Sequence, residues 1–566
     1  MPTLNWIGKD AVVKHHKDVP FRLLEPVPAL SCGDPSSGNL IVQGDNLHAL
    51  KALLPRYGGQ VKCIYIDPPY NTGNEGWAYN DNVNSPEIRK WLGAVVGKEG
   101  ETLDRHDRWL CMMYPRLLLL RQFLRDDGVI FVSIDDVELH HLRCLMDEIF
   151  GVGRRLATLV WRTDGNFDNQ AKIKNCHEYI LAYAINPDRF PHPKVVDPSV
   201  GKGSKLNRSV IQNTIVKNGI KNPVSSVTLP VDFPAAISDA VIAARTTSWP
   251  HYSQELIIRD GRLANAVAAS SGWSSKDLLV EFIANGFEPI KDSKGQQTRF
   301  VLTGTAAIES IKERQHASHV VSVVSGVGST QAQSAALTEM GFSFPFPKPV
   351  DLVSYLISMV DGKDALVLDT FGGSGTTGHA VLAQNLLDGG TRKFILVEMD
   401  DKIARNVTAE RVKRVSKGYT NAKGEAVTGL GAGFQFCTLS AEPLFTPQGQ
   451  IRDDVRYAQL AEFVWFAETG SGYTPAALDS CLGGNDAFGA TPLLGVHEGR
   501  AIYLLYNGIL KDKSVGGGNV LTGPVFGILP PFDGPKTIYA AACRLGAPRL
   551  QREQIVFKQT PYALEV

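Results

Sequence analysis

The feature that most constrains the fold is a glycine-rich stretch, residues 369–378 (DTFGGSGTTG), which follows an apolar strand pattern at 365–369. Its last six residues have the spacing G-x-G-x-x-G, and a helical pattern follows at 376–385. The next strand pattern, 393–397, ends at Glu398, about 20 residues beyond the glycines. Such glycines let the backbone approach a ligand, and an acid after the second strand accepts hydrogen bonds from a ribose. The stretch therefore predicts a parallel sheet that binds a nucleoside-type cofactor.

Strand and helix patterns alternate on both sides of this loop, which is typical of a doubly wound, mostly parallel α/β sheet. The pattern loosens over 187–340, a stretch rich in Ser, Asn and Thr that predicts an inserted α+β domain. Strand patterns return near the C-terminus. The expected strands are 61–66, 128–134, 156–161, 177–185, 365–369, 393–397, 500–506, 536–541 and 554–557, and the expected helices are 104–126, 135–150, 350–360, 376–385 and 401–415.

Charge and composition exclude several classes of protein. The chain has 58 basic and 58 acidic residues, so it is not a globally basic nucleic-acid binder. Residues 151–350 nevertheless carry 22 Lys and Arg against 16 Asp and Glu, which makes this part the expected polyanion contact. No apolar run approaches the ~20 residues that cross a bilayer, and residues 1–18 lack the apolar core of a signal peptide. Eight cysteines without a Cys-x-x-Cys pair fit reduced thiols in a cytoplasm.

A second motif, Asp67-Pro68-Pro69-Tyr70, follows the strand pattern at 61–66. Two prolines fix φ and remove two amide donors, so that carbonyl oxygens and the Asp67 carboxylate can face one point. Such a pocket of acceptors suits an exocyclic amine, which donates two N–H bonds, and Tyr70 adds a flat stacking surface. The simpler alternative is an ordinary turn with a capping aspartate. Residues 71–103, rich in Asn and Gly, predict a long loop or lid.

The DPPY motif, followed by Asn71-Thr72-Gly73, together with the downstream FGGSGTTG resembles the amino-methyltransferases of DNA. The order of the two motifs resembles the β group of those enzymes, and within it the modification subunit of type III restriction–modification systems. Further similar segments are GDNLHAL, GVIFVSIDDVELHHL, HEYILAYAIN and FPKP. The resemblance covers roughly 39–186 and 343–415, and is weak elsewhere.

This resemblance implies a Rossmann-like methyltransferase fold with an inserted target-recognition domain and a small C-terminal α/β domain. It implies S-adenosyl-L-methionine as cofactor, double-stranded DNA as substrate, a homodimer, a separate helicase–nuclease subunit as partner, and a bacterial or archaeal cytoplasm. No membrane contact is expected. The implied parts are an N-terminal arm (1–38), a catalytic part (39–186), a target-recognition domain (187–342), a cofactor-binding part (343–430) and a C-terminal domain for dimer or partner contacts (431–566).

The resemblance also assigns roles to single residues. Asp67, Pro68, Pro69 and Tyr70 would hold a flipped-out adenine for transfer to its N6 amine. Aspartate at position 67, where serine is common in cytosine-type relatives, favours adenine, and cytosine-N4 remains the alternative. Asp67 would also border the cofactor, whose other contacts would be Asp45 (adenine region), Lys348 (carboxylate), Asp369 and Thr376 (methionine end), Phe371, Gly373 and Gly375 (pocket shape) and Glu398 (ribose).

DNA contacts are expected from aromatic and basic residues outside the two motifs. They are Trp77, Tyr79, Lys202, Lys205, Arg208, Lys217 and Lys221. We expect no metal site, because the neighbouring pairs Asp135-Asp136 and His140-His141 include side chains that point apart on a helix and predict a solvated face.

Two other functions compete with methyl transfer. A nicotinamide-dependent oxidoreductase explains 365–398 but leaves DPPY and the loop after it without a role. A non-catalytic DNA-recognition subunit does not require the intact Asp67 and Tyr70.

Overall fold

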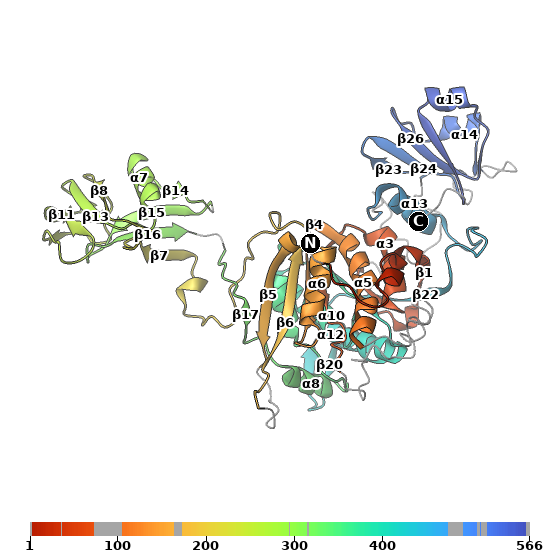
Figure 1. Cartoon of the computed structure of the whole chain (residues 1–566), viewed down its shortest axis with the longest axis horizontal. Helices are drawn as coiled ribbons and strands as arrows, with labels where there is room; N and C mark the ends of the chain where they lie inside the picture. The colour runs from red at the N-terminus through yellow and green to blue at the C-terminus, as the bar shows by residue number, and fades with distance from the viewer. Residues whose placement is uncertain are drawn as a thin grey trace. The chain divides into compact units, whose positions relative to one another are not determined.

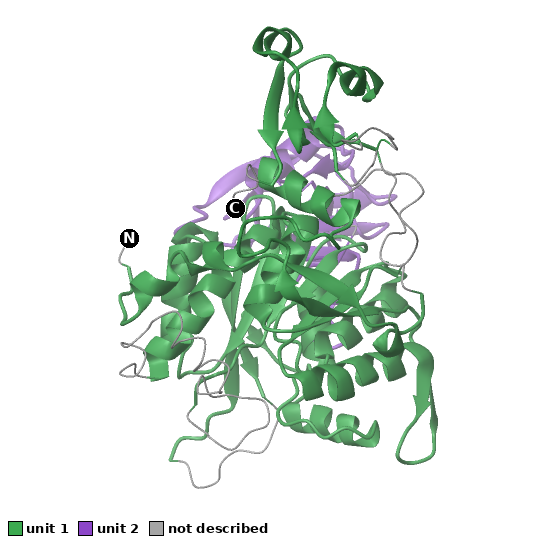
Figure 2. Cartoon of the chain, turned by 90° about the vertical axis from the view of Figure 1, so that its right-hand side faces the viewer, with its two compact units in different colours: residues 1–192, 321–566 green, residues 193–320 purple. Residues whose placement is uncertain are grey.

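The structure, a computed structural model, describes residues 3–34, 37–72, 105–163, 172–293, 295–313, 316–473, 491–506, 510 and 518–561. It divides into two compact units, residues 1–192 with 321–566 (unit 1) and residues 193–320 (unit 2), shown in two colours in Figure 2. The expected loop at 71–103, with Trp77 and Tyr79, lies almost entirely outside the described residues. A search of the described helices finds none with the length and apolar character needed to cross a membrane.

A ten-stranded mixed sheet forms the centre of unit 1 (Figure 1). Its order is β1-β22-β2-β19-β18-β3-β4-β6-β5-β17. The run from β22 to β4 is parallel, while β1 and β6 are antiparallel to their neighbours. The strands are β1 (Arg22–Pro26), β2 (Leu40–Gln43), β3 (Val61–Ile66), β4 (Leu124–Ile134), β5 (Arg155–Arg162), β6 (His177–Ala184), β17 (Val323–Val324), β18 (Leu366–Asp369), β19 (Lys393–Glu398) and β22 (Gln435–Pro443).

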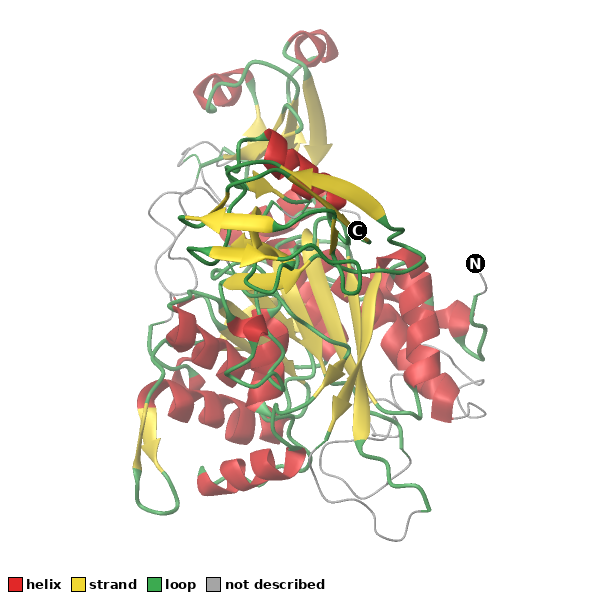
Figure 3. Ribbon diagram, turned by 90° about the vertical axis from the view of Figure 1, so that its left-hand side faces the viewer, coloured by secondary structure: helices red, strands yellow, loops and turns green. Residues whose placement is uncertain are grey.

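Helices lie on both sides of this sheet (Figure 3), which explains why the central strands are continuous apolar runs rather than alternating ones. One group, α3, α5 and α6, packs together, and α10 packs against α9 and α12. The bounds are α3 (Asn46–Tyr57), α5 (Arg105–Phe123), α6 (Leu139–Ile149), α9 (Val350–Ser358), α10 (Thr376–Asp388) and α12 (Glu410–Lys417). A short helix, α11 (Asp401–Ile403), and a π-helical segment, η6 (Ala404–Ala409), lead into α12.

The segment expected to be an N-terminal arm contributes to unit 1. Its short helices α1 (Lys9–Val12) and α2 (His15–Asp18) contact α5, and β1 pairs with β22. Trp6, Val12 and Val19 are buried in the core cluster that α3, α5 and α6 share with the sheet. These contacts come from apolar residues spaced too irregularly for a periodic pattern.

Unit 2 consists of three small antiparallel sheets and one helix, α7 (Lys276–Ala284). Its largest sheet has the order β14-β15-β16-β7, and its core gathers Phe233, Phe282 and Phe300. The strands are β7 (Val210–Thr214), β8 (Ser225–Leu229), β9 (Ala240–Ile242), β10 (His251–Tyr252), β11 (Leu256–Arg259), β12 (Arg262–Leu263), β13 (Val267–Ser271), β14 (Ile290–Lys291), β15 (Gln297–Leu302) and β16 (Ile308–Glu313).

The last part of unit 1 has its own four-stranded sheet, of order β23-β24-β26-β28. The buried carboxylate of Glu468, on α13, accepts hydrogen bonds from Arg500 and Tyr539 of this sheet. The elements are α13 (Tyr457–Thr469), β23 (Leu493–His497), β24 (Arg500–Leu504), β26 (Lys536–Ala540), α15 (Ala547–Arg552) and β28 (Ile555–Gln559). The three strands expected in this region are β24, β26 and β28.

Several element boundaries differ from the sequence pattern, and two starting points differ by four residues. The helix expected at 135–150 starts only at Leu139, because Asp135 forms a turn in which its side chain accepts from the Val137 N–H. The strand expected from residue 128 starts at Leu124, which pairs with Val61 across an irregular register. Both differences lie at element ends, where apolar periodicity carries little information.

Candidate functional site

The two sequence motifs follow two neighbouring parallel strands. β18 leads into the glycine-rich loop, β3 leads into Asp67, and these strands pair with each other. From β18 the sheet continues through β19 on one side, and from β3 it continues through β4 on the other. The carboxyl ends of strands at such a reversal of strand order are where open α/β sheets bind their ligands.

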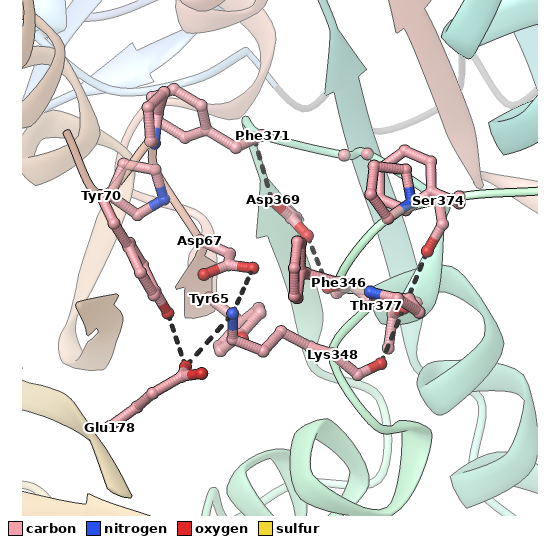
Figure 4. A pocket seen from close by; sticks show the side chains of 18 of the residues that line it. Tyr65, Asp67, Tyr70, Glu178, Phe346, Lys348, Asp369, Phe371, Ser374 and Thr377 are labelled. Carbon is pink, nitrogen blue, oxygen red and sulfur yellow. Dashed lines mark hydrogen bonds and ion pairs between the residues drawn. The ribbon is translucent and has the colours of Figure 1, made fainter. Parts of the chain in front are cut away.

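A cavity of about 290 Å³ lies at this point, and both motifs line it (Figure 4). Its walls come from the 67–70 turn, the 371–374 loop, the segment 344–348 before α9, and single residues of β3 and β6. The lining residues are Tyr65, Asp67, Pro68, Pro69, Tyr70, Thr72, Glu178, Phe344, Pro345, Phe346, Pro347, Lys348, Asp369, Phe371, Gly372, Gly373, Ser374, Thr376 and Thr377.

The glycine-rich loop is held in its shape by side chains on both of its flanks. Gly373 and Gly375 have φ of 49° and 80°, in the left-handed region where glycine is favoured. The Gly373 N–H donates to Oε2 of Glu398 at 2.7 Å, and the Phe371 N–H donates to Oδ1 of Asp369 at 3.0 Å. Arg411 of α12 donates to the carbonyl of Ser374 at 3.0 Å. Helix α10 starts directly after this loop, so its N-terminus faces the same region.

The two acids that flank the loop are buried at 3 % exposure each. Burial raises the pKa of Asp369 to about 7, although the Thr377 hydroxyl donates to it at 2.5 Å. Burial likewise raises the pKa of Glu398 to about 7. The backbone N–H groups of Asp400 and Gly373 oppose this rise, because they donate to the carboxylate and stabilise its charged form. Both carboxyls therefore titrate near neutrality, and Asp369 does so at the cavity wall.

The DPPY turn is fixed from behind by α5. The indole N–H of the fully buried Trp109 donates to the carbonyl oxygen of Pro69 at 2.7 Å. Asp67 has one carboxylate oxygen, Oδ2, 3.0 Å from Nζ of Lys348. Its other oxygen, Oδ1, is buried and has no hydrogen-bond partner among the described residues. The turn thus presents one carboxylate oxygen, Oδ1 of Asp67, that can still accept a hydrogen bond from a ligand.

Lys348 joins the turn to β6. Its Nζ lies 3.3 Å from Oε2 of Glu178 and 4.7 Å from the centre of the Tyr70 ring, and the Tyr70 hydroxyl donates to the same Glu178 oxygen at 2.9 Å (Figure 4). Burial lowers the pKa of Lys348, but Asp67 and Glu178 outweigh this and raise it. Burial raises the pKa of Asp67, and the Lys348 ammonium opposes that rise. The charged lysine is thus shared between two carboxylates.

The structure brings most, but not all, of the expected site residues to the cavity wall. Glu398 and Gly375 support the loop without lining the cavity. Asp45 caps α3 by accepting from the N–H groups of Leu47 and His48 and pairs with Arg116 at 3.1 Å, also outside the cavity wall. The expected basic DNA contacts Lys202, Lys205, Arg208, Lys217 and Lys221 are exposed residues of unit 2.

Glu178 and Phe346 are cavity residues that sequence reasoning missed. Glu178 is a charged residue at the start of the otherwise apolar strand β6, which was a usable signal. Phe346 is 56 % exposed and has a φ of 49°. A phenylalanine between two prolines, Pro345 and Pro347, was the usable sequence signal for Phe346.

A glycine-rich loop that faces an acidic, proline-fixed turn at the switch point of a Rossmann-like sheet defines an enzyme with a nucleoside-type cofactor. Residues 61–410, more than half of the chain, match the DNA methylase family (N6_N4_Mtase), and the chain belongs to that family. Membership favours neither the oxidoreductase nor the recognition-only alternative.

Two curated relatives match most of the chain. The StyLTI Mod subunit of a type III restriction-modification enzyme from Salmonella typhimurium is 29 % identical over 72 % of this chain and 60 % of its own length. The EcoPI Mod subunit from Escherichia phage P1 is 29 % identical over 75 % of this chain and 69 % of its own. Among solved structures, the cytosine-N4-specific PvuII DNA methyltransferase covers 67 % of this chain and 93 % of its own at 13 % identity, with a TM-score of 0.31.

Proposed function

We propose that the protein is a site-specific DNA methyltransferase that transfers the methyl group of S-adenosyl-L-methionine to the N6 amine of a flipped-out adenine. The observation that carries this proposal is that the 67–70 turn and the 371–374 loop line one cavity. Membership of the DNA methylase family supports the reaction class, and aspartate at position 67 supports adenine.

The loop side of the cavity fits the cofactor. Left-handed glycines let the backbone approach closely, and the N-terminus of α10 favours the carboxylate end of a bound amino acid. Phe371, Asp369 and Thr376 are the wall residues that contact it, while Glu398, through the Gly373 N–H, fixes the loop that receives the ribose side. Bound there, S-adenosylmethionine supplies an electrophilic methyl group on a sulfonium.

The turn side of the cavity fits an exocyclic amine. Asp67 and the carbonyl oxygen of Pro68 accept its two N–H bonds, which directs the nitrogen lone pair toward the loop side. Lys348 keeps the Asp67 carboxylate charged, and the Trp109 bond to Pro69 holds the turn rigid. Positioning of the two reactants supplies much of the rate acceleration. The proton that leaves the amine passes to solvent.

The adenine must leave the base stack to reach this cavity, at a cost of a few kcal/mol. Stacking on an aromatic ring recovers about 1–3 kcal/mol, and Tyr70 and Phe346 are the wall residues that offer a ring face. The basic residues of unit 2 contact DNA phosphates and position the duplex. Residues 187–342 thus act as the target-recognition part, with unit 2 at its centre.

The similarity to two Mod subunits supports the same biological setting for this chain, in a bacterial or archaeal cytoplasm. In that setting the chain forms a homodimer and binds a helicase–nuclease subunit. Residues 431–566 provide those contacts, because this part lies outside the family match and none of its described residues lines the cavity.

Cytosine-N4 transfer is the second candidate, because the family name covers both acceptor amines. Sequencing of native DNA from an expressing host, with modified-base detection, separates the two and reads the target site. N6-methyladenine at one recurring sequence supports the proposal, and N4-methylcytosine overturns the choice of base.

The direct test is transfer of a tritiated methyl group to mixed-sequence DNA by Asp67→Asn and by the matched surface variant Asp364→Asn. We expect Asp67→Asn to lose at least about 100-fold in rate, the scale of loss that misplaced reactants cause. Asp364→Asn should behave as the wild type. Cofactor affinity, measured by calorimetry, should stay within a few-fold in both. Transfer by Asp67→Asn at a near-normal rate would remove the mechanism.

A further inference from the structure

Behind the DPPY turn, two histidines face one buried carboxylate. His106 lies in the first turn of α5, Glu138 directly precedes α6, and His141 follows three residues later. Nδ1 of His106 is 2.6 Å from Oε1 of Glu138, and Nδ1 of His141 is 2.7 Å from Oε2. One ligand atom from each residue lies within 4.8 Å of the others. The Glu138 side chain is 0 % exposed, whereas His106 and His141 are 28 % and 20 % exposed.

This set of side chains has the chemistry of a metal site. Two imidazoles and one carboxylate are a common ligand set for Zn²⁺. Glu138, the residue that precedes α6, and His141 in its first turn are three residues apart, and their side chains meet at 2.7 Å across that turn. Ligand atoms around a tetrahedral ion with bonds of about 2.0–2.2 Å stand roughly 3.3 Å apart. The contacts of His106 and His141 with Glu138 therefore need to open by less than about 1 Å, and the widest separation in the set, up to 4.8 Å, needs to close by about 1.5 Å.

A cation also answers an electrostatic need. A buried carboxylate is costly unless a positive charge or good hydrogen bonds compensate it. Among the described residues, the partners of Glu138 are the two histidines and Asn71, whose amide donates to Oε1 at 2.5 Å. These three short hydrogen bonds compensate part of the cost, and a bound cation would supply the positive charge that none of the three partners carries permanently. The Asn71 bond also orients the carboxylate, as outer hydrogen bonds do for metal ligands.

We propose that His106, Glu138 and His141 bind one divalent transition-metal ion of the Zn²⁺ class. The ion ties the start of α5 to the start of α6. Through Glu138 it also holds Asn71, the residue that follows Tyr70 of the catalytic turn. Asn71 has a φ of 58°, is 1 % exposed, and is kept there by its bonds to Glu138 and to the Arg105 carbonyl. The proposed metal site is thus structural: it stabilises the segment that follows the turn and contains none of the residues that line the cavity.

The pair His140-His141 predicted no metal site from sequence, because adjacent helical side chains are expected to point apart. In the structure the rings of His140 and His141 nevertheless lie with their centroids 3.9 Å apart, and two further ligand candidates are present, Glu138 three residues before His141 and His106 on another helix. His140 is exposed and takes no part in the cluster. It therefore provides a matched control one residue away.

The test uses the full chain without a polyhistidine tag, stripped with a chelator and titrated with Zn²⁺ and with Co²⁺. We expect the wild type and His140→Gln to bind one equivalent and to melt at higher temperature as Zn²⁺ is added. His141→Gln and His106→Gln should each lose at least tenfold in affinity. Asn71→Ala should lose about 10–100-fold, the usual effect of removing an outer hydrogen bond.

Equal binding by the wild type, His141→Gln and His106→Gln overturns the proposal and leaves a metal-free hydrogen-bonded cluster. Circular dichroism checks that the variants fold. Should a variant fail to fold, the wild type decides alone, because less than half an equivalent of Co²⁺ bound at saturation also overturns the site. These outcomes do not depend on methyl transfer, so they are separate from the test of Asp67.

Discussion

Replacement of Lys348 by methionine removes the ammonium group that lies between Asp67 and Glu178. At 3.0 Å and an effective dielectric constant of about 20, the Lys348–Asp67 attraction is roughly 5 kcal/mol. Part of this attraction is offset by the free energy that the Lys348 ammonium loses when burial removes its hydration. An opposite charge at this distance changes a carboxyl pKa by about 1–3 units, which corresponds to about 1.4–4 kcal/mol. Burial already raises the pKa of Asp67, so loss of the ammonium raises it further.

The sign of the effect on activity follows from the charge that catalysis needs. Protonation turns one Asp67 oxygen into a donor and weakens the other as an acceptor, so methyl transfer falls as the pH drops through its pKa. In Lys348→Met that acid limb should move up by about 1–3 pH units. The assay is the pH dependence of single-turnover transfer of tritiated methyl groups to DNA. The exposed Lys363→Met provides the control, with an unchanged profile.

The outcome also distinguishes two roles for Lys348. If the ammonium mainly binds the cofactor carboxylate, as the sequence resemblance implies, Lys348→Met raises the Kd for S-adenosylmethionine and leaves the acid limb in place. A profile that superimposes on that of the wild type after scaling refutes the electrostatic argument.

Four further substitutions test the support of the site. Gly389→Ala, at φ 67° with open space around the added Cβ, should cost about 1–2 kcal/mol. Gly375→Ala, at φ 80° with a backbone oxygen 3.3 Å from the added Cβ, should lower the free energy of unfolding by more than Gly389→Ala does, and should weaken cofactor binding. Equal urea midpoints of the two variants contradict this. Trp109→Phe loses the hydrogen bond to the Pro69 carbonyl, so it should lower the free energy of unfolding by about 1–3 kcal/mol and should also lower the rate of methyl transfer. An unchanged rate shows that the turn is rigid without this hydrogen bond. Because the pKa of Glu398 is raised to about 7, the folded state retains a proton that the unfolded state loses, so stability should fall from pH 4.5 to 7. Asp369, whose pKa is also raised to about 7, contributes a slope of the same sign, so urea melts of Glu398→Gln should show a shallower slope than those of the wild type, and a parallel slope rejects the prediction.

The parts of the fold that the sequence predicts best are the central strands. VKCIYI and the strand before the glycine loop are buried on both faces, so their residues form apolar runs whose ends are marked by Asp67 and Asp369. Unit 2 was predicted only as an irregular insertion. Its strands are two to six residues long, too short for periodicity to define them.

The site was predictable where one short segment carries several functional groups. Both motifs are of this kind, and their side chains meet because β3 and β18 are neighbours. The contact of Tyr70 with Glu178 spans 108 residues, and the two pair only because β4 and β6 place them together. The same holds for the three-residue cluster at Glu138, whose His106 comes from a separate helix. Sequence spacing contains no information on such meetings.

The way in which unit 2 joins the rest of the chain has a consequence for how the molecule can be altered. Val196 and His319 pair in parallel near the two ends of that unit, and the His319 N–H donates to the carbonyl oxygen of Val195 at 2.9 Å. The entering and leaving chain therefore run one strand spacing, about 4.8 Å, apart. Because the two segments run in the same direction, a chain lacking 197–318 needs a flexible linker that doubles back rather than a two-residue turn. With such a linker the truncated chain can keep its ten-stranded sheet, whose strands all lie outside 197–318. Unit 2 can then be exchanged between relatives if the two connecting segments, near Val196 and His319, keep their pairing.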